Sequence, residues 1–199
     1  MKPYVLAALF ITAAALLFFR RHRIWPFYCI LGAAGFTLLA VILLRHGPVE
    51  RLVEEQTALA AHIVAGLLGV VTRVFRNAPG TILVLIVGQE LGWTVVNIDI
   101  ECSGFLEMLV FTGLCLFYPG FSLAQRVGWL VGGNLATFLF NLVRVVAIVC
   151  CLHWGGKDII YLAHTVIGRG LFFFLVIMLY WFAFTRSSLG RVARALVGK

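Results

Sequence analysis

Three side chains in the C-terminal half of the sequence belong to the residue types that acyl-transfer chemistry uses. Cys102 offers a nucleophile, Arg144 a fixed cation with up to five hydrogen-bond donors, and His164 a general base. Asn141 lies three residues before Arg144 and so shares its helix face. Each residue also has a structural interpretation, as a small core hydrophobe, a mutually bonded Asn–Arg pair or an interfacial hydrogen-bonding histidine. The chemistry is therefore predicted from the set and not from any one member.

The surroundings of the thiol strengthen the prediction. Cys102 occurs in the run Glu101-Cys102-Ser103-Gly104, where a predicted strand meets a predicted helix. A helix N-terminus carries free amide protons and the positive end of the helix dipole, which lower a thiol pKa and hold an oxyanion. Gly104 allows another backbone or a substrate to approach closely. We therefore expect a reactive thiol at this junction.

Few ionisable side chains fall inside the apolar stretches, where they are costly and are candidates for function. They are His62, Glu107, Arg144, His164 and Arg169. Glu107 follows Cys102 by five residues, which is about 7.5 Å of helix rise. Arg169 follows His164 by the same interval. The spacing predicts that Glu107 and Arg169 form a buried ion pair directly beneath the site.

The composition says where these residues must lie. Of the 199 residues, 62% are hydrophobic and 12% are charged, against about 45–50% and about 25% in soluble domains. This balance excludes a soluble globular enzyme and a disordered chain, and indicates an integral membrane protein. The net charge of +8 is interpreted as basic residues that flank membrane helices, with no nucleic-acid partner. The five cysteines lack metal-ligand spacing, so no metal, cofactor or disulfide framework is predicted.

Six apolar stretches are predicted to be helices, at about 4–19, 27–44, 56–72, 102–118, 128–151 and 159–184. The first is interpreted as a retained helix and not as a cleaved signal peptide. The third, 56–72, either crosses the membrane or lies at its interface. Residues 81–87 and 92–100 are rich in β-branched side chains, and a turn separates them. They are predicted to form a β-hairpin outside the bilayer, because open strand edges are not tolerated in lipid.

The predicted fold class is an all-α polytopic membrane protein with about six transmembrane or membrane-associated helices and a small extracytoplasmic hairpin. Arg126 and the basic tail 186–199 indicate the cytoplasmic side. The starts of the fourth and sixth helices, with Cys102 and His164, then face outward. The side of the Arg20–Arg23 cluster depends on whether 56–72 crosses, and the count of basic residues does not decide it.

The ordered set of Cys102-Ser103-Gly104, Asn141-x-x-Arg144 and His164 resembles the exosortase/archaeosortase family. The short chain and the run 163–169 resemble the compact G-type exosortases in particular, and Leu67-Leu68-Gly69-Val70 also fits the family pattern. The resemblance covers about residues 52–185, which would be the catalytic core of a single membrane-embedded domain spanning 1–199. Residues 1–50 would be variable N-terminal helices, and 186–199 a basic cytoplasmic tail.

The resemblance implies a cysteine transpeptidase or protease in a prokaryotic plasma membrane. Such an enzyme cleaves the C-terminal sorting tail, which includes a membrane-spanning helix, of exported proteins. Cys102 would form a thioester, His164 would exchange protons, and Arg144 would stabilise the oxyanion or the thiolate. Supporting roles fall to Asn141, Ser103, Gly104, Glu107 and Arg169. The acceptor would be a lipid, a glycan or water, and membrane lipids surround the chain. The alternative is a non-catalytic membrane subunit or transporter component with a buried Arg/Glu/His network.

Overall fold

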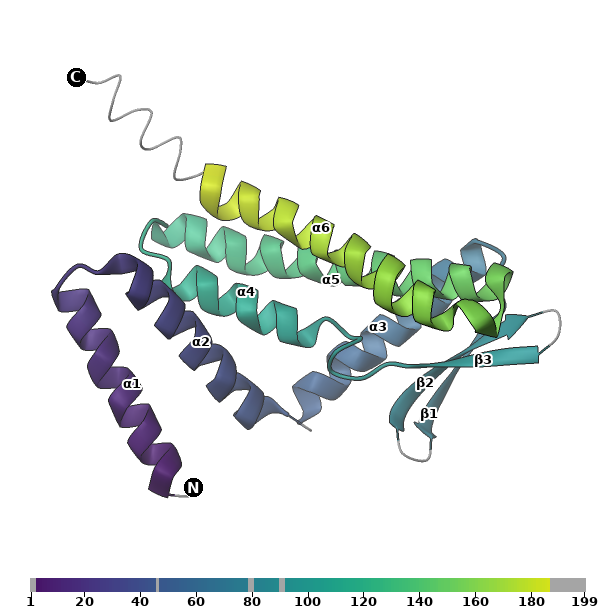
Figure 1. Ribbon diagram of the computed structural model, residues 1–199, viewed down its shortest axis with the longest axis horizontal. Helices are drawn as coiled ribbons and strands as arrows, with labels where there is room; N and C mark the ends of the chain where they lie inside the picture. The colour runs from purple at the N-terminus through teal and green to yellow at the C-terminus, as the bar shows by residue number, and fades with distance from the viewer. Residues whose placement is uncertain (1–2, 46, 79–80, 90–91, 187–199) are drawn as a thin grey trace.

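The computed structural model describes residues 3–45, 47–78, 81–89 and 92–186, and most of them are helical (Figure 1). The helices are α1 (Pro3–Arg21), α2 (Trp25–Leu44), α3 (Pro48–Leu67), α4 (Phe105–Phe117), α5 (Leu123–Gly155) and α6 (Arg169–Tyr180). A 3₁₀ turn at Lys157–Ile159 follows α5. Helix α6 continues at each end into a π-helical stretch, Leu162–Gly168 before it and Trp181–Thr185 after it.

Three segments among the described residues are long and apolar enough to cross a membrane. They are α2, α5 and the continuous segment Leu162–Thr185, and α4 is a shorter apolar helix of 13 residues. A membrane protein built mainly from helices is therefore confirmed. The six membrane crossings that the sequence suggests are not confirmed.

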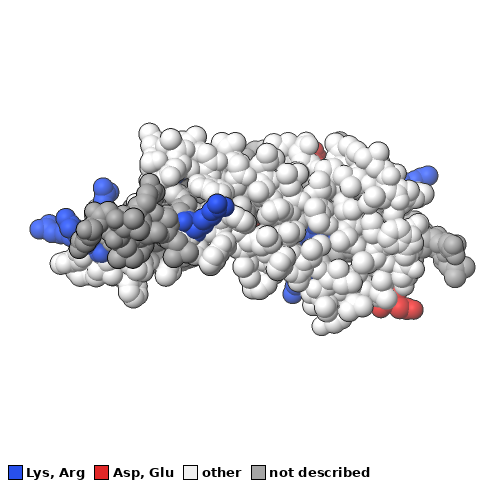
Figure 2. Space-filling view, turned by 90° about the horizontal axis from the view of Figure 1, so that it is seen from above, with Lys and Arg blue, Asp and Glu red and all other residues white. Residues whose placement is uncertain are grey.

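The helices α4, α5 and α6 lie side by side along the molecule (Figure 1). Helix α2 packs antiparallel against α4, with Gly113 against Ala33 and Gly32 against Phe117. The α1–α2 turn, the α4–α5 connection and the end of α6 consequently lie at the same end of the molecule (Figure 1). In these segments, or in the helix turns next to them, are Arg20, Arg21, Arg23, Arg126 and Arg186. In Figure 2 Lys and Arg gather at that end, whereas the middle of the face shown is almost uncharged.

Helix α3 differs from its prediction. It begins at Pro48 instead of near residue 56, because proline is favoured in the first helical turn, where its missing amide proton removes no bond. The helix thereby includes Glu50 and Glu54, and it is not among the candidate spans. Gly69, with a φ of 79°, ends it, and the Val70 amide donates to the Ala65 carbonyl at 2.9 Å. This cap turns the chain into the sheet.

The predicted hairpin is present as two paired antiparallel strands, but the sheet also has a third strand that was not predicted. The sheet has three antiparallel strands in the order β1 (Thr72–Ala78), β2 (Thr81–Gln89) and β3 (Gly92–Asn97). Strand β1 was missed because Arg73 and other polar residues break up its apolar character, although Thr72 is buried and Arg73 is exposed, as a period of two requires. The last predicted strand residues, 98–100, instead belong to the loop before α4.

Three packed clusters fill the interior of the described residues, and the smallest, with Ala40, Phe105 and Leu109, joins α2 to α4. An aliphatic cluster joins α3, β3 and the second half of α5, and its buried members include Ala58, Ala61, Ala65, Val96, Ile98, Cys102, Val145 and Val149. An aromatic cluster joins α4, the first half of α5 and the end of α6, and includes Phe111, Phe121, Tyr118, Tyr180 and Phe184. Cys102 thus lies at the edge of the aliphatic cluster, where the loop from β3 enters α4.

Candidate active site

The structure brings Cys102 and His164 together although 62 residues separate them in sequence. The Sγ atom of Cys102 lies 3.5 Å from Nε2 of His164. Cys102 is buried in the loop before α4, and the half-buried His164 belongs to the π-helical stretch before α6. A π-helical turn shifts the register of a helix face and recurs at functional sites. The pair has the arrangement of a thiol beside a general base.

Asp99 holds the nucleophile loop in shape, and the sequence reasoning missed it. Its Oδ1 accepts hydrogen bonds from the amides of Glu101 at 3.1 Å and Cys102 at 3.0 Å. Its carbonyl accepts from the Ser103 amide at 2.8 Å. An aspartate two residues beyond the end of a strand, and two residues before an amide it can bind, is the signal that would have predicted this turn.

Asn141 and Arg144 hold two successive carbonyls of the same loop. Asn141 Nδ2 donates to the Cys102 carbonyl at 2.8 Å, and an Arg144 terminal nitrogen donates to the Glu101 carbonyl at 3.3 Å. The predicted shared helix face therefore turns both side chains toward the loop and not toward each other. Both are buried in the interior of α5. Their first role is to fix the loop that carries the thiol.

Arg144 also keeps a cation beside the thiol. Its guanidinium lies 5.5 Å from the centre of the Phe172 ring, a cation–π contact between residues far apart in sequence. Its Nε atom has no hydrogen-bond partner. Neighbouring protein atoms cover this atom.

Ser103 and Gly104 shape the start of α4. The Ser103 hydroxyl donates to the Ile100 carbonyl at 3.3 Å and accepts from the Phe105 amide at 3.4 Å, while Thr57 of α3 donates to the Ser103 carbonyl at 3.3 Å. Gly104 has a φ of 76°, and a Cβ there would lie 2.9 Å from Asn141 side-chain atoms. Only glycine fits this position.

The predicted electrostatics of the thiol is wrong. Burial, reinforced by the negative charge of Asp99 and opposed by Arg144, raises the pKa of Cys102 to about 11. The helix begins at Phe105, three residues later, and the Cys102 amide already donates to Asp99. The helix N-terminus therefore neither lowers the pKa of this thiol nor leaves the Cys102 amide free for an oxyanion. Arg144 is the donor that remains.

Glu107 and Arg169 line one cavity of about 670 Å³ with Arg144. Within the part of the chain that the structure describes, however, no ion pair joins Glu107 to Arg169. Oε2 of Glu107 has no hydrogen-bond partner, and Arg169 is exposed. The predicted buried pair is therefore not formed. Equal helix rise put the two residues at similar depth but did not fix the directions of their side chains.

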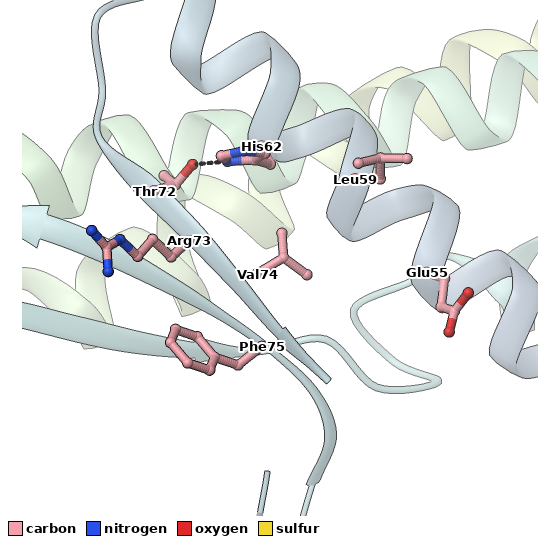
Figure 3. Close-up of a pocket in the computed structure, with 7 residues that line it drawn as sticks. All are labelled: Glu55, Leu59, His62, Thr72, Arg73, Val74 and Phe75. Carbon is pink, nitrogen blue, oxygen red and sulfur yellow. Dashed lines mark hydrogen bonds between the residues drawn. The ribbon is translucent and has the colours of Figure 1, made fainter. Parts of the chain in front are cut away.

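His62 lies in a second cavity, of about 410 Å³, between α3 and β1 (Figure 3). Its Nδ1 is 2.7 Å from the Thr72 hydroxyl. Glu55, Leu59, Arg73, Val74 and Phe75 complete the lining. His62 is thus separate from the Cys102 site. Among the described residues, no group of three His, Cys, Asp or Glu side chains is placed to hold a metal ion.

No protein-family model matches the chain, and no similar protein was found among curated proteins or solved structures. The family resemblance therefore stays a prediction from the motifs. The geometry around Cys102 stands independently of it.

Proposed function

We propose that this protein is a membrane-embedded cysteine transpeptidase or protease of the exosortase type, which cleaves the C-terminal sorting tail of exported proteins. The observation that carries the proposal is the 3.5 Å contact between Cys102 Sγ and His164 Nε2. A thiol and an imidazole from distant segments have little reason to meet over a loop braced by buried Asn141 and Arg144 unless the pair reacts.

The chemistry follows from the protonation state of the thiol. With a pKa of about 11, Cys102 is neutral at physiological pH, so His164 accepts its proton as sulfur attacks the scissile carbonyl. The positive charge of the Arg144 guanidinium, which a hydrogen bond to the Glu101 carbonyl holds at the loop, stabilises the developing oxyanion. Collapse breaks the C–N bond, His164 returns the proton to the leaving amine, and the acyl group remains on Cys102 as a thioester. A lipid or glycan nucleophile, or water, then resolves the thioester.

The position of the site suits a substrate that crosses the membrane. From Leu123 to Asn141, α5 rises about 27 Å, close to the roughly 30 Å hydrocarbon thickness. Asn141 binds the Cys102 carbonyl, so the thiol lies near one interface when the start of α5 lies at the other. The arginines at the opposite end favour the cytoplasm there. In a prokaryotic plasma membrane, the active site would face the extracytoplasmic side.

Thioester formation tests the proposal directly. The full chain is expressed in a prokaryotic membrane with exported, tail-bearing proteins, and the Cys102 peptide is analysed by mass spectrometry before and after hydroxylamine treatment. We expect a hydroxylamine-sensitive acyl adduct on Cys102, loss of tail processing in Cys102→Ala, and normal processing in Cys115→Ala, which removes another buried thiol. Processing by Cys102→Ala would overturn the mechanism and favour the non-catalytic membrane subunit.

Thiol reactivity is a second, substrate-independent measurement. The alkylation rate of Cys102 by a membrane-impermeant maleimide should rise with pH up to about 11, because only the thiolate reacts. Asp99→Asn should increase the rate at a given pH by removing a charge that raises the thiol pKa. Labelling of Cys102 only from the cytoplasmic side would show that the proposed orientation is wrong.

A further inference from the structure

The cavity of about 670 Å³ that Glu101 and Arg144 line has both charged and apolar side chains in its wall. Glu101, Glu107, Arg144 and Arg169 supply two carboxylates and two guanidinium groups. Its apolar lining comes from Leu106, Phe172, Phe173 and Val176 of α4 and α6. The volume is within the range of about 300–1,000 Å³ that is usual for small-molecule sites.

Two buried atoms in this lining lack partners. They are Nε of Arg144, whose side chain is 5% exposed, and Oε2 of Glu107. Both atoms are covered by protein, so a ligand in the cavity meets other atoms of the two side chains, where the guanidinium of Arg144 favours a negative group and the carboxylate of Glu107 a positive one. Arg169 lines the same cavity and adds a second cation for the acceptor group. The preferred ligand therefore carries a negative and a positive group close together.

The apolar part of the lining indicates the chemistry of the rest of the ligand. Leu106 and Phe173 are both exposed, and α6 continues into the exposed Phe174 and Ile177. An exposed apolar wall on membrane helices faces acyl chains. We propose that this cavity binds a phosphoethanolamine group on a phospholipid, with the phosphate on Arg144 and Arg169 and the primary ammonium on Glu107. Binding is measured without a protein substrate, so the inference does not depend on the peptidase function.

Lipid titration of the full chain in detergent, followed by native mass spectrometry, tests the ligand. The probes are phosphatidylethanolamine, phosphatidylcholine and phosphatidylglycerol with identical acyl chains, and soluble phosphoethanolamine. We expect phosphatidylethanolamine to bind about tenfold more tightly than phosphatidylcholine, since a quaternary ammonium has no N–H to donate to Glu107 and loses a charge-assisted hydrogen bond. Soluble phosphoethanolamine should bind more weakly than the lipid, because it lacks acyl chains. Equal or tighter binding of the soluble compound would overturn the assignment to a lipid.

Variants separate the two ends of the head group. Glu107→Gln should remove the preference for phosphatidylethanolamine and leave phosphatidylcholine binding unchanged. Arg169→Gln should weaken both lipids, whereas Arg169→Lys should retain them. Matched controls are Glu55→Gln in the second cavity and Arg186→Gln beyond the end of α6, which should change nothing.

Three further results would contradict the proposal. They are equal binding of the ethanolamine and choline lipids to the unmodified protein, a preference that survives Glu107→Gln, and tightest binding of phosphatidylglycerol. Helix content by circular dichroism, compared with the control variants, identifies a variant that fails to fold. If Arg169→Gln fails to fold, lipid binding is measured on Arg169→Lys instead, because lysine preserves the charge at that position.

Discussion

The two halves of α5 are packed by different kinds of side chain. From Leu123 to Phe140 the helix lies against the aromatic cluster, where large rings fill the space between α4, α5 and α6. From Asn141 to Leu152 it lies against the aliphatic cluster, where alanines of α3 face valines of α5. Small side chains let helices approach closely, and the polar groups that brace Cys102 come at the point where one kind of packing gives way to the other.

This difference in packing suggests that the first half of α5 contributes mainly to stability and the second half to the chemistry. The first half supplies bulk that holds membrane helices together, and no predicted catalytic side chain comes from it. The second half supplies Asn141 and Arg144, whose hydrogen bonds set the position of the thiol. Changes in the first half should therefore lower stability, and changes at the start of the second should lower activity.

Phe111→Ala should have the largest effect on stability. The ring is fully buried in the aromatic cluster and lies over Gly133, so its removal should cost about 3–5 kcal/mol in the free energy of unfolding. Denaturant unfolding in detergent measures the loss. Cys102 alkylation below the transition should stay unchanged, and a change in its rate would show that the two halves are coupled.

Gly104→Ala should damage the site and the fold together. The left-handed φ costs about 1–3 kcal/mol for a non-glycine residue, and the added Cβ would lie 2.9 Å from Asn141 side-chain atoms. Tail processing should be lost and the thermal midpoint lowered. Gly128→Ala is the control, since no atom lies within 4 Å of its added Cβ, and it should match the unmodified protein. An active, stable Gly104→Ala would refute this account of the loop.

Two asparagines on α5 give a matched pair across the two halves. Asn134 binds the Thr112 hydroxyl at 2.9 Å, whereas Asn141 binds the Cys102 carbonyl at 2.8 Å. Each substitution by alanine should cost about 1–3 kcal/mol of stability through an unpaired polar group. Only Asn141→Ala should also slow processing, because it releases the nucleophile loop. Equal activity of the two variants, measured at matched membrane levels, would remove the proposed division.

Glu54→Gln should have an effect on stability that depends on pH. Burial, together with Glu50 and Asp99, raises the pKa of Glu54 to about 7. The folded state therefore holds a proton that the unfolded state releases above about pH 4.3, and the resulting stability is lost as pH rises toward 7. The variant should raise the thermal midpoint at pH 8 and change it little at pH 4. A larger gain at pH 4 would contradict the sign.

Hydropathy predicted the helices well and their ends poorly. The positions of α1, α2, α4 and α6 follow the apolar stretches, because lipid-facing helices are apolar on every side. The start of α3 was missed because its first turns contain buried Glu50 and Glu54, which no apolar window includes. Strand β1 was missed because its alternation contains arginine. Both errors arise where the chain is not apolar.

The candidate site was predicted by residue type and not by electrostatics. Cys102, Arg144 and His164 were named from the sequence, and the structure places Cys102 beside His164 and Arg144 on the loop. The role of Asp99 was not foreseen, and it takes the amide that the helix N-terminus was expected to offer. Its charge and the burial of the thiol reverse the expected shift in pKa.

The sequence by itself determined that this is a membrane protein with a thiol, a guanidinium and an imidazole in or near its apolar helices, because composition and residue type are properties of the chain. Tertiary structure alone decided which of these groups meet. Burial, the direction of each side chain and the 3.5 Å approach of Cys102 to His164 depend on how α3, α5 and α6 pack, and helix packing is not encoded in the spacing of residues along one helix. The same packing brought Arg20–Arg23 to the end that carries Arg126, a placement that charge counting left open.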